Sequence, residues 1–394
     1  MNDRRPDILV IGGGPAGLAT AIRARQEGLA VTLVDGGQPP IDKACGEGLM
    51  PDGVALLGRL GVVLPEDRCR TLCGVRYLED DIVVEAPFPG PPGLGVRRLD
   101  LHRALVHRAG TIGVDLHWGV RVTGLEGNFP GAADGVATDD GPMRARWLVA
   151  ADGLHSPLRR AAGMEGTSAH CRRFGLRRHF AIAPWTDHVE VHWSDGVEAY
   201  VTPLGGDLVG VALLFADHPP DFDRLLRRFP ALARRLAGAT PASRQRGAGP
   251  LEQRTRGVVR GNLALVGDAA GYLDAITGEG LSLAFHDAAA VVEAIVRGNL
   301  AIYAAAHRRM ARVPTSLIRL ALFVDRHPRV RRRVMRALAA DPRLFRALLA
   351  VHVRVRPPAP AAAWILPRLA WRLALPLPAV TVPYLPPPSS PGRG

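Results

Sequence analysis

DILVIGGGPAGLATAIRARQEGLAVTLVD, residues 7–35, decides the fold of this chain. A short apolar run leads into a glycine-rich turn, a helical stretch follows, and a second apolar run ends in an acid. The spacing predicts a strand, a tight turn, a helix and a second strand. Gly12 would permit the turn, Gly14 would let the backbone approach a pyrophosphate, and Gly17 would let the helix lie close to the sheet. The stretch therefore predicts a dinucleotide-binding unit.

The acid at the end of this stretch strengthens that prediction. Pro15 and Ala16 open the helix, whose amino end would face the phosphates of the ligand. Asp35 ends the second apolar run, where a carboxylate can accept hydrogen bonds from a ribose. A glycine turn with a purely structural role would leave Asp35 without an explanation.

Two later segments have the same character. Residues 145–163 read as a strand followed by Asp152, and residues 261–296 read as a strand followed by Gly267 and Asp268. The carboxyl ends of strands are where an open α/β sheet binds ligands, and Asp268 could hold a ribityl hydroxyl. The long helix after this second strand opens with three further candidate residues, whose amides could face an acceptor that becomes negative on reduction: Gly278, Gly280 and Leu281.

The order GxGxxG, ADGxxSxxR and GDAA resembles the FAD-binding signature of the group A flavoprotein monooxygenases, typified by p-hydroxybenzoate hydroxylase, over residues 8–296. The segments KACGEGL and DAITGEGLSLAF are more similar to the branch that contains geranylgeranyl reductases and the oxidoreductases of polyketide and phenolic-lipid pathways. The resemblance implies FAD as the cofactor. It implies cofactor-binding roles for Gly12, Gly14, Gly17, Asp35, Arg98, Asp152 and Asp268. For Arg98, a surface helix arginine is the alternative.

The expected fold is α/β: a Rossmann-type FAD-binding domain, an interleaved antiparallel β-sheet substrate domain and a C-terminal helical segment. Apolar runs with proline and glycine between them predict the antiparallel sheet, which the strands of residues 73–88 are expected to join. The expected division of the chain is as follows: residues 1–72, 97–165 and 251–300 for the FAD-binding domain, 73–96 and 166–250 for the substrate sheet, 301–356 for basic helices, and 357–394 for a proline-rich tail, whose last residues, PPPSSPGRG, are not expected to pack.

The segment IDKACGEGLM, residues 41–50, holds the only lysine of the chain. If this glycine-rich segment folds over the flavin, Lys43 could counter the negative charge of a phenolate, a reduced flavin or a pyrophosphate, and Cys45 could face the substrate. The alternatives are a surface lysine and a buried small hydrophobe. Related reductases carry a YxWxFP-like stretch where this chain reads EAYVTP, so Tyr200 stands in the place of the tryptophan. Lys43, Cys45 and Tyr200 are the candidate catalytic residues.

Charge is distributed unevenly along the chain. Residues 301–394 hold 17 arginines and only two acids, Asp325 and Asp341, which gives them a net charge of +15 within a chain of net charge +13. A solvated basic face is one interpretation, and contact of Arg331, Arg332 and Arg333 with an anionic membrane is the other. Helix-turn-helix, zinc-finger and RNP-like patterns are absent from the sequence, so nucleic acid is not expected as a partner.

The remaining features favour a cytoplasmic protein. The four cysteines form no CxxC pair and show no zinc-site spacing, so we expect a reduced protein without a metal site. Apolar residues of signal-peptide length do not precede the first glycines. The apolar residues 361–382 are interrupted by prolines and arginines, so they are not expected to span a membrane.

Together these features predict a FAD-dependent monooxygenase of an apolar aromatic, phenolic or polyketide-type substrate from secondary metabolism, with O2 as co-substrate. The sequence has no second GxGxxG unit, so NAD(P)H would bind transiently as the electron donor. Reduction of an isoprenoid double bond is the alternative on the same fold. A flavin-bearing assembly factor without turnover is a third possibility. The sequence indicates neither the substrate nor the oligomeric state.

Overall fold

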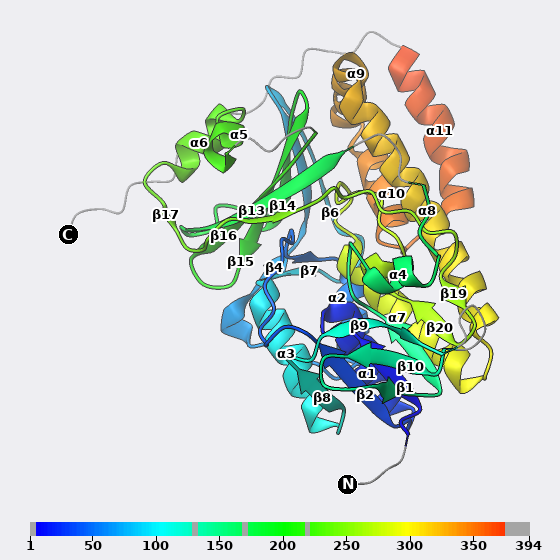
Figure 1. Cartoon of the computed structure of the whole chain (residues 1–394). Coiled ribbons are helices and arrows are strands. Elements are labelled where there is room, and N and C mark those ends of the chain that lie inside the picture. Colours follow the sequence, from blue (N-terminus) through cyan, green and yellow to red (C-terminus); the bar gives the residue numbers. More distant parts are fainter. Residues whose placement is uncertain (1–4, 128–132, 168–171, 217–220, 375–394) are drawn as a thin grey trace.

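The computed structural model describes residues 5–127, 133–167, 172–216 and 221–374 of the chain. The lower part of the molecule in Figure 1 is built on a six-stranded sheet in the order β19, β20, β12, β1, β2, β8. Neighbouring strands are parallel except β19 and β20. The strands are β1 (Ile8–Ile11), β2 (Val31–Asp35), β8 (Asp115–Trp118), β12 (Trp147–Ala150), β19 (Val259–Arg260) and β20 (Leu263–Leu265).

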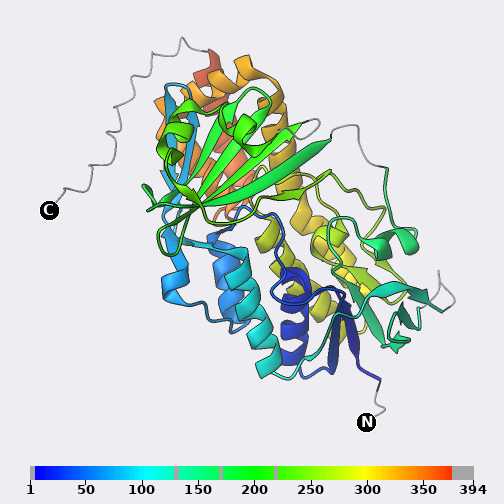
Figure 2. The same ribbon diagram turned by 60° about the vertical axis from the view of Figure 1, so that its left-hand side comes forward.

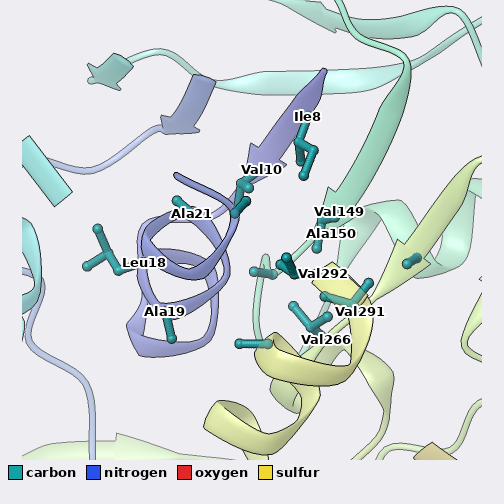
Figure 3. Close-up of a cluster of buried hydrophobic side chains, with 14 of the residues drawn as sticks. Ile8, Val10, Leu18, Ala19, Ala21, Val149, Ala150, Val266, Val291 and Val292 are labelled. Carbon is teal, nitrogen blue, oxygen red and sulfur yellow. The ribbon is translucent and has the colours of Figure 1, made fainter. Parts of the chain in front are cut away.

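Helices pack together on this sheet, whose strands are buried as those of parallel sheets usually are. Helix α1 (Pro15–Gln26) packs against both α3 (Arg98–Thr111) and α7 (Gly280–Val296). All four residues of β1 are buried. Figure 3 shows apolar side chains of β1, α1, β12 and α7 meeting in one core. The order of strand, turn, helix and strand predicted from residues 7–35 is confirmed.

A second, eight-stranded sheet lies above the first one in Figures 1 and 2. Its order is β17, β13, β16, β15, β14, β5, β6, with β18 paired to β13. The strands are β5 (Gly74–Glu79), β6 (Ile82–Pro87), β13 (Arg173–Ala181), β14 (His188–Ser194), β15 (Val197–Leu204), β16 (Leu208–Ala216), β17 (Thr240–Pro241) and β18 (Arg246–Ala248). The predicted fold class is confirmed, and so is the expectation that residues 73–88 join the second sheet.

The two faces of this sheet are covered by different helices. Val197, Ala199 and Val201 of β15 pack in a cluster with the short helices α5 (Phe222–Leu226) and α6 (Pro230–Leu236). Apolar residues of β5, β6 and β14 pack on the other face, against the C-terminal helices. These are α8 (Leu300–Arg326), α9 (Pro328–Ala340) and α10 (Pro342–His352), which lie beside the sheet in Figure 1.

Smaller elements complete the structure. One three-stranded sheet joins β3 (Gly48–Leu49), β7 (Gly93–Val96) and β4 (Cys69–Leu72), and another joins β9 (Val122–Glu126), β10 (Gly135–Thr138) and β11 (Met143–Arg144). Because β4 and β7 pair, the expected domain boundaries at residues 72 and 96 run through a sheet and not through linkers. The other short helices are α2 (Pro51–Arg59), α4 (Pro157–Ala161) and the 3-10 helices η1 (Glu66–Arg68) and η2 (Gly267–Ala270).

The first half of the expected proline-rich tail, residues 357–394, is largely a packed helix. Residues 358–374 form helix α11 (Pro358–Ala374), whose Ala361 and Ile365 are buried against the other C-terminal helices. Proline is tolerated in the first turn of a helix, so Pro358 starts α11 rather than preventing it. Residues 375–394 of the expected tail lie outside the described residues. Within the described ranges, no helix is both long and apolar enough to cross a membrane.

The arginine triplet at residues 331–333 is divided: Arg331 is buried and takes no part in a basic face, whereas Arg332 and Arg333 are exposed, and contact of the triplet with a membrane stays a prediction. The side chain of Arg331 is only 1% exposed and lies 2.8 Å from carboxylate oxygens of both Glu79 and Asp195. Arg332 pairs with Asp80 at 2.8 Å, and Nε of Arg333 donates to a backbone carbonyl of α11. The sequence could not reveal this outcome, because Glu79 lies 252 residues away on β5.

Strand β13 carries a second buried arginine, Arg173, that joins three carboxylates from separate parts of the chain. Its nitrogens lie 3.0 Å from Glu198 on β15, 2.9 Å from Asp274 in the loop before α7, and 2.8 Å from Asp325 on α8. Burial raises the pKa of Glu198 to about 8 although Arg173 lowers it. One guanidinium therefore holds the second sheet, the C-terminal helices and the loop before α7 together.

We predict that Arg173→Ala lowers the free energy of unfolding by about 3–5 kcal/mol, because it leaves buried carboxylates without their counterion. Arg103→Ala is the control, since Arg103 is 59% exposed and pairs with Asp100 on the same helix. Its cost should be about 1 kcal/mol or less. Urea denaturation of both variants measures the difference, and equal effects would show that the Arg173 cluster does not stabilise the fold.

Candidate active site

The glycine turn between β1 and α1 contains two positions that cannot hold a side chain. Gly12 has φ +111°, and a Cβ there would lie 2.3 Å from the carbonyl oxygen of Ala151. A Cβ at Gly17 would lie 1.8 Å from the carbonyl oxygen of Gly12. These contacts fit the roles predicted for Gly12 in the turn and for Gly17 in the close approach of α1 to the sheet.

Gly14 differs from both, because open space surrounds it. A Cβ at Gly14 would meet nothing closer than Nη2 of Arg98, at 3.9 Å. Gly14 is the residue that precedes α1, and Pro15 and Ala16 form its first turn. Nε of Arg98 is buried and has no hydrogen-bond partner within the described part of the chain. Space in front of a helix amino end, beside an unpartnered guanidinium nitrogen, fits a pyrophosphate.

Side chains from β2 and α3 fix the shape of the turn. The carboxylate of Asp35 accepts hydrogen bonds from the amides of Gly13 and Gly37, at 2.6 and 2.7 Å. Nε2 of His102 lies 2.8 Å from the carbonyl oxygen of Gly13. Asp35 therefore stands at the end of β2 as predicted, and it also orders the turn. Its contact with a ribose stays a prediction.

Asp268 meets a group of cations at the edge of the same space. It lies in η2. The protein around its solvent-accessible carboxyl group raises the pKa of that group, whereas the positive charges of Arg98, Lys43 and Arg159 oppose this rise. Nζ of Lys43 lies 3.3 Å from the point where Gly153 would carry a Cβ. The structure thus brings the lysine of residues 41–50 to the edge where the second and third motifs end.

Asp152 and Arg159 have structural partners. The carboxylate of Asp152 accepts from the hydroxyl of Ser156 at 2.5 Å and from the amide of Leu158 at 3.0 Å, which caps α4. Arg159 is fully buried and donates to the carbonyl oxygen of Ala269 at 3.2 Å. The ADGxxSxxR motif therefore ties the end of β12 to η2. A direct role of Asp152 in cofactor binding stays a prediction.

The other four positions predicted in the third motif lie in η2 and around the start of α7. Gly267 has φ +58°, and a Cβ there would lie 2.7 Å from Cβ of Ala16, so η2 packs directly on the first turn of α1. Gly278 also has a positive φ, and Gly280 and Leu281 are the first two residues of α7. A Cβ at Gly280 would lie 3.7 Å from the ring of Tyr272. The amino ends of α1 and α7 therefore flank η2.

The segment that carries Lys43 and Cys45 is held by charged residues of β13. Glu47 has φ +61° and is buried, with its carboxylate 2.5 Å from Nε2 of His179 and 2.9 Å from the amide of Arg98. Arg177 pairs with Asp42 and donates to the carbonyl oxygen of Lys43. These contacts fix the path of residues 42–47 from the side of the second sheet.

Cys45 and Tyr200 lie in different surroundings. Burial raises the pKa of the half-buried Cys45 thiol although Arg98 lowers it. The hydroxyl of Tyr200 donates to Glu198 at 2.9 Å and lies 2.8 Å from the carbonyl oxygen of Ile276. Tyr200 therefore holds the loop before α7, and its predicted catalytic role has no free hydroxyl to support it.

Four residues of this region were missed by the sequence analysis: Glu47, Arg177, His179 and Tyr272. Glu47 and Tyr272 stand inside the motifs GEG and GDAAGYLD, so their position was the available signal. Arg177 and His179 alternate along β13, which places them on one face. Within the described residues, histidine, cysteine and acidic side chains form no group that could hold a metal ion.

Comparison with known proteins identifies the family. Residues 5–206 match the family model described as FAD binding domain. The menaquinone reductase of Mycolicibacterium smegmatis is 31% identical over 323 residues, which cover 77% of this chain and 79% of that protein. The ubiquinone hydroxylase UbiL of Rhodospirillum rubrum is 26% identical over 325 residues, which cover 75% of this chain and 73% of that protein.

A solved structure gives the same fold. A flavoprotein/dehydrogenase from Cytophaga hutchinsonii has a TM-score of 0.77 over 88% of this chain and 92% of that chain, at 18% identity. The chain therefore belongs to the FAD-binding-domain family and is a FAD-dependent oxidoreductase. The resemblance to group A flavoprotein monooxygenases is confirmed. FAD supplies redox chemistry, and the protein supplies binding and orientation.

Gly14→Val tests the assignment of the space before α1. A Cβ there has room, because the nearest protein atom, Nη2 of the Arg98 side chain, is 3.9 Å away. The methyl groups of the valine would fill the space assigned to the pyrophosphate, so we expect FAD affinity to fall by about 1–3 kcal/mol or more.

Titration of the apoprotein with FAD measures this loss, and thermal unfolding of the apoprotein checks the fold. The control is Gly58→Val, since Gly58 is exposed on α2 and no atom lies within 4 Å of its Cβ position. Unchanged FAD affinity in Gly14→Val would contradict the assignment of Gly14.

Proposed function

We propose that the protein is a FAD-dependent monooxygenase that hydroxylates an apolar aromatic or phenolic substrate. NAD(P)H would bind transiently and supply two electrons. One atom of O2 would enter the substrate as a hydroxyl group and the other would leave as water. The single observation that carries this proposal is that the charges of Lys43 and Arg98 both act on Asp268, while Arg98 also borders the open space in front of Gly14.

Lys43 and Arg98 give this edge a positive potential. A cation beside a phenol favours its phenolate, which is the more electron-rich form of the ring and the better acceptor of an electrophilic oxygen. Asp42 and Glu47 on the same segment face away, toward Arg177 and His179 of β13. In the proposed mechanism, β13 therefore positions the segment and Lys43 acts on the substrate.

The relatives support a substrate of lipid-like character. The names of two of them refer to menaquinone and to ubiquinone, and the two reactions named are a reduction and a hydroxylation. We therefore place the substrate of this protein among apolar quinones and the phenols from which they derive.

Reduction of a carbon–carbon double bond is the second candidate, and Cys45 is the observation that favours it. Such a reduction adds a hydride equivalent to one carbon and a proton to the other. Because burial raises the pKa of the Cys45 thiol, this group keeps its proton at neutral pH and could donate it. The electrons would again come from NAD(P)H through the cofactor.

The two candidates differ in their products. Purified holoenzyme is given NAD(P)H with an apolar phenol or with menaquinone, in air and without oxygen. We expect substrate-stimulated NAD(P)H oxidation in air only, with a product one oxygen atom heavier by mass spectrometry. A product with two hydrogen atoms added to a carbon–carbon double bond of the isoprenoid chain, formed without oxygen, would replace the first candidate by the second. No stimulated NAD(P)H oxidation with any such substrate would contradict both.

Lys43→Met tests the role of the ammonium. If Lys43 stabilises a phenolate, its loss should shift the rise of kcat/KM with pH to higher pH. The expected shift is about 1 pH unit or more. Arg297→Met is the control, because Arg297 is 61% exposed and pairs with Glu293 at the far end of α7. An unchanged pH profile of kcat/KM in Lys43→Met, with FAD still bound, would contradict the role proposed for Lys43.

A further inference from the structure

Helix α11 exposes an apolar surface. Every residue of α11 that is exposed is an alanine, a proline, a leucine or a tryptophan. Trp364 is 41% exposed and Trp371 is 59% exposed. They are seven residues apart, which places them on one face, while Ala361 and Ile365 face the other C-terminal helices. In Figure 1, α11 lies on the outside of the molecule beside α9 and α10. This outward face of Trp364 and Trp371 is called the tryptophan face.

Two arginines border the tryptophan face. The guanidinium of Arg368 lies 5.1 Å from the ring centroid of Trp364, and that of Arg372 lies 5.2 Å from the ring of Trp371. Both arginines share a single carboxylate, Asp341, at 2.7 and 3.8 Å. The helix therefore combines bulky aromatic rings with cations in excess of the nearby acid, which is the composition of helices that lie in a membrane interface.

The size of the face favours a lipid surface over a second copy of the chain. A helix of 17 residues is about 25 Å long and about 10 Å wide, so one face offers on the order of 250 Å². A specific protein interface needs about 800 Å² from each partner. Binding to a bilayer requires no such minimum contact area.

The positive charge of the C-terminal segment also favours a lipid surface as the binding partner of the tryptophan face. Residues 301–394 carry a net charge of +15, and α11 itself contains no acid. Arginines near an anionic lipid surface contribute about 1 kcal/mol each. Arg331 takes no part in this, because it is buried against Glu79 and Asp195.

We propose that α11 docks the protein on an anionic lipid bilayer, with Trp364 and Trp371 at the depth of the headgroups. Helix α11 would then lie in the plane of the surface and bring the C-terminal helices against the membrane. Docking goes beyond the proposed reaction and does not depend on it, because binding can be measured without turnover.

Cosedimentation of the full-length holoenzyme with vesicles tests the proposal. The vesicles contain phosphatidylcholine and phosphatidylglycerol in equal parts, and phosphatidylcholine alone serves for comparison. We expect binding to the anionic vesicles that weakens with salt. The double variant Trp364→Ser with Trp371→Ser should lower the partition coefficient by about tenfold or more. Val63→Ser is the control, because Val63 is an exposed apolar residue at a distant loop, 85% accessible.

Each outcome decides the proposal. The flavin absorption spectrum and the thermal unfolding temperature should be unchanged in the double variant, since α11 packs through its other face. Absence of binding by the unchanged protein, or equal binding by the double variant, would overturn the proposal. If the double variant instead converted a dimer into a monomer in sedimentation velocity, the tryptophan face would join two copies and the membrane proposal would be wrong.

Discussion

Arg173, Arg177 and His179 lie on one face of β13, and each binds a segment that leaves the first sheet and reaches across to the second one. Arg173 holds Asp274 in the loop before α7, while Arg177 and His179 hold residues 42–47. Removing the guanidinium charges of Arg173 and Arg177 from water costs several kcal/mol for each ion, so they persist only when paired. The pairing is therefore conditional on both segments being in place. The same three residues that join the two sheets also determine where Lys43, Cys45 and the start of α7 lie.

The parts of the fold that the sequence predicted are those with a local cause. A pattern of 29 residues predicts the first strand, the glycine turn, the first helix and the second strand. The turn could be predicted because it depends on the glycines of that same stretch. Alternating apolar residues predicted the second sheet in the same way. The ion pairs could not be predicted, because Arg173 and Asp325 are 152 residues apart and an arginine on a helix has the same local pattern whether it is solvated or paired. Helix α11 was missed because its prolines suggested a tail, although one of them stands where a helix can begin.

In the candidate site, too, the sequence predicted local features and missed contacts between distant residues. The unusual lysine drew attention to residues 41–50, and the structure places Lys43 beside Asp268 and Arg98. Glu47 was passed over because a buried glutamate with a positive φ, set between two glycines, is visible only once His179 is known to face it. Tyr200 was singled out through its place in a related motif. Its hydroxyl is occupied by Glu198 and Ile276, so Tyr200 holds the loop before α7.

The buried pairs between the C-terminal helices and the second sheet bear on how chains of this family can be recombined. Asp325 and Arg331 lie near one another in the sequence, yet their partners Arg173 and Glu79 lie on two different strands of the sheet. A chimera that took residues 300–374 from a relative would need matching charges at four positions at once. Without them, an unpaired ion would be buried on each side of the junction. The C-terminal helices are therefore not an exchangeable module. An engineered chimera has to take them together with the second sheet.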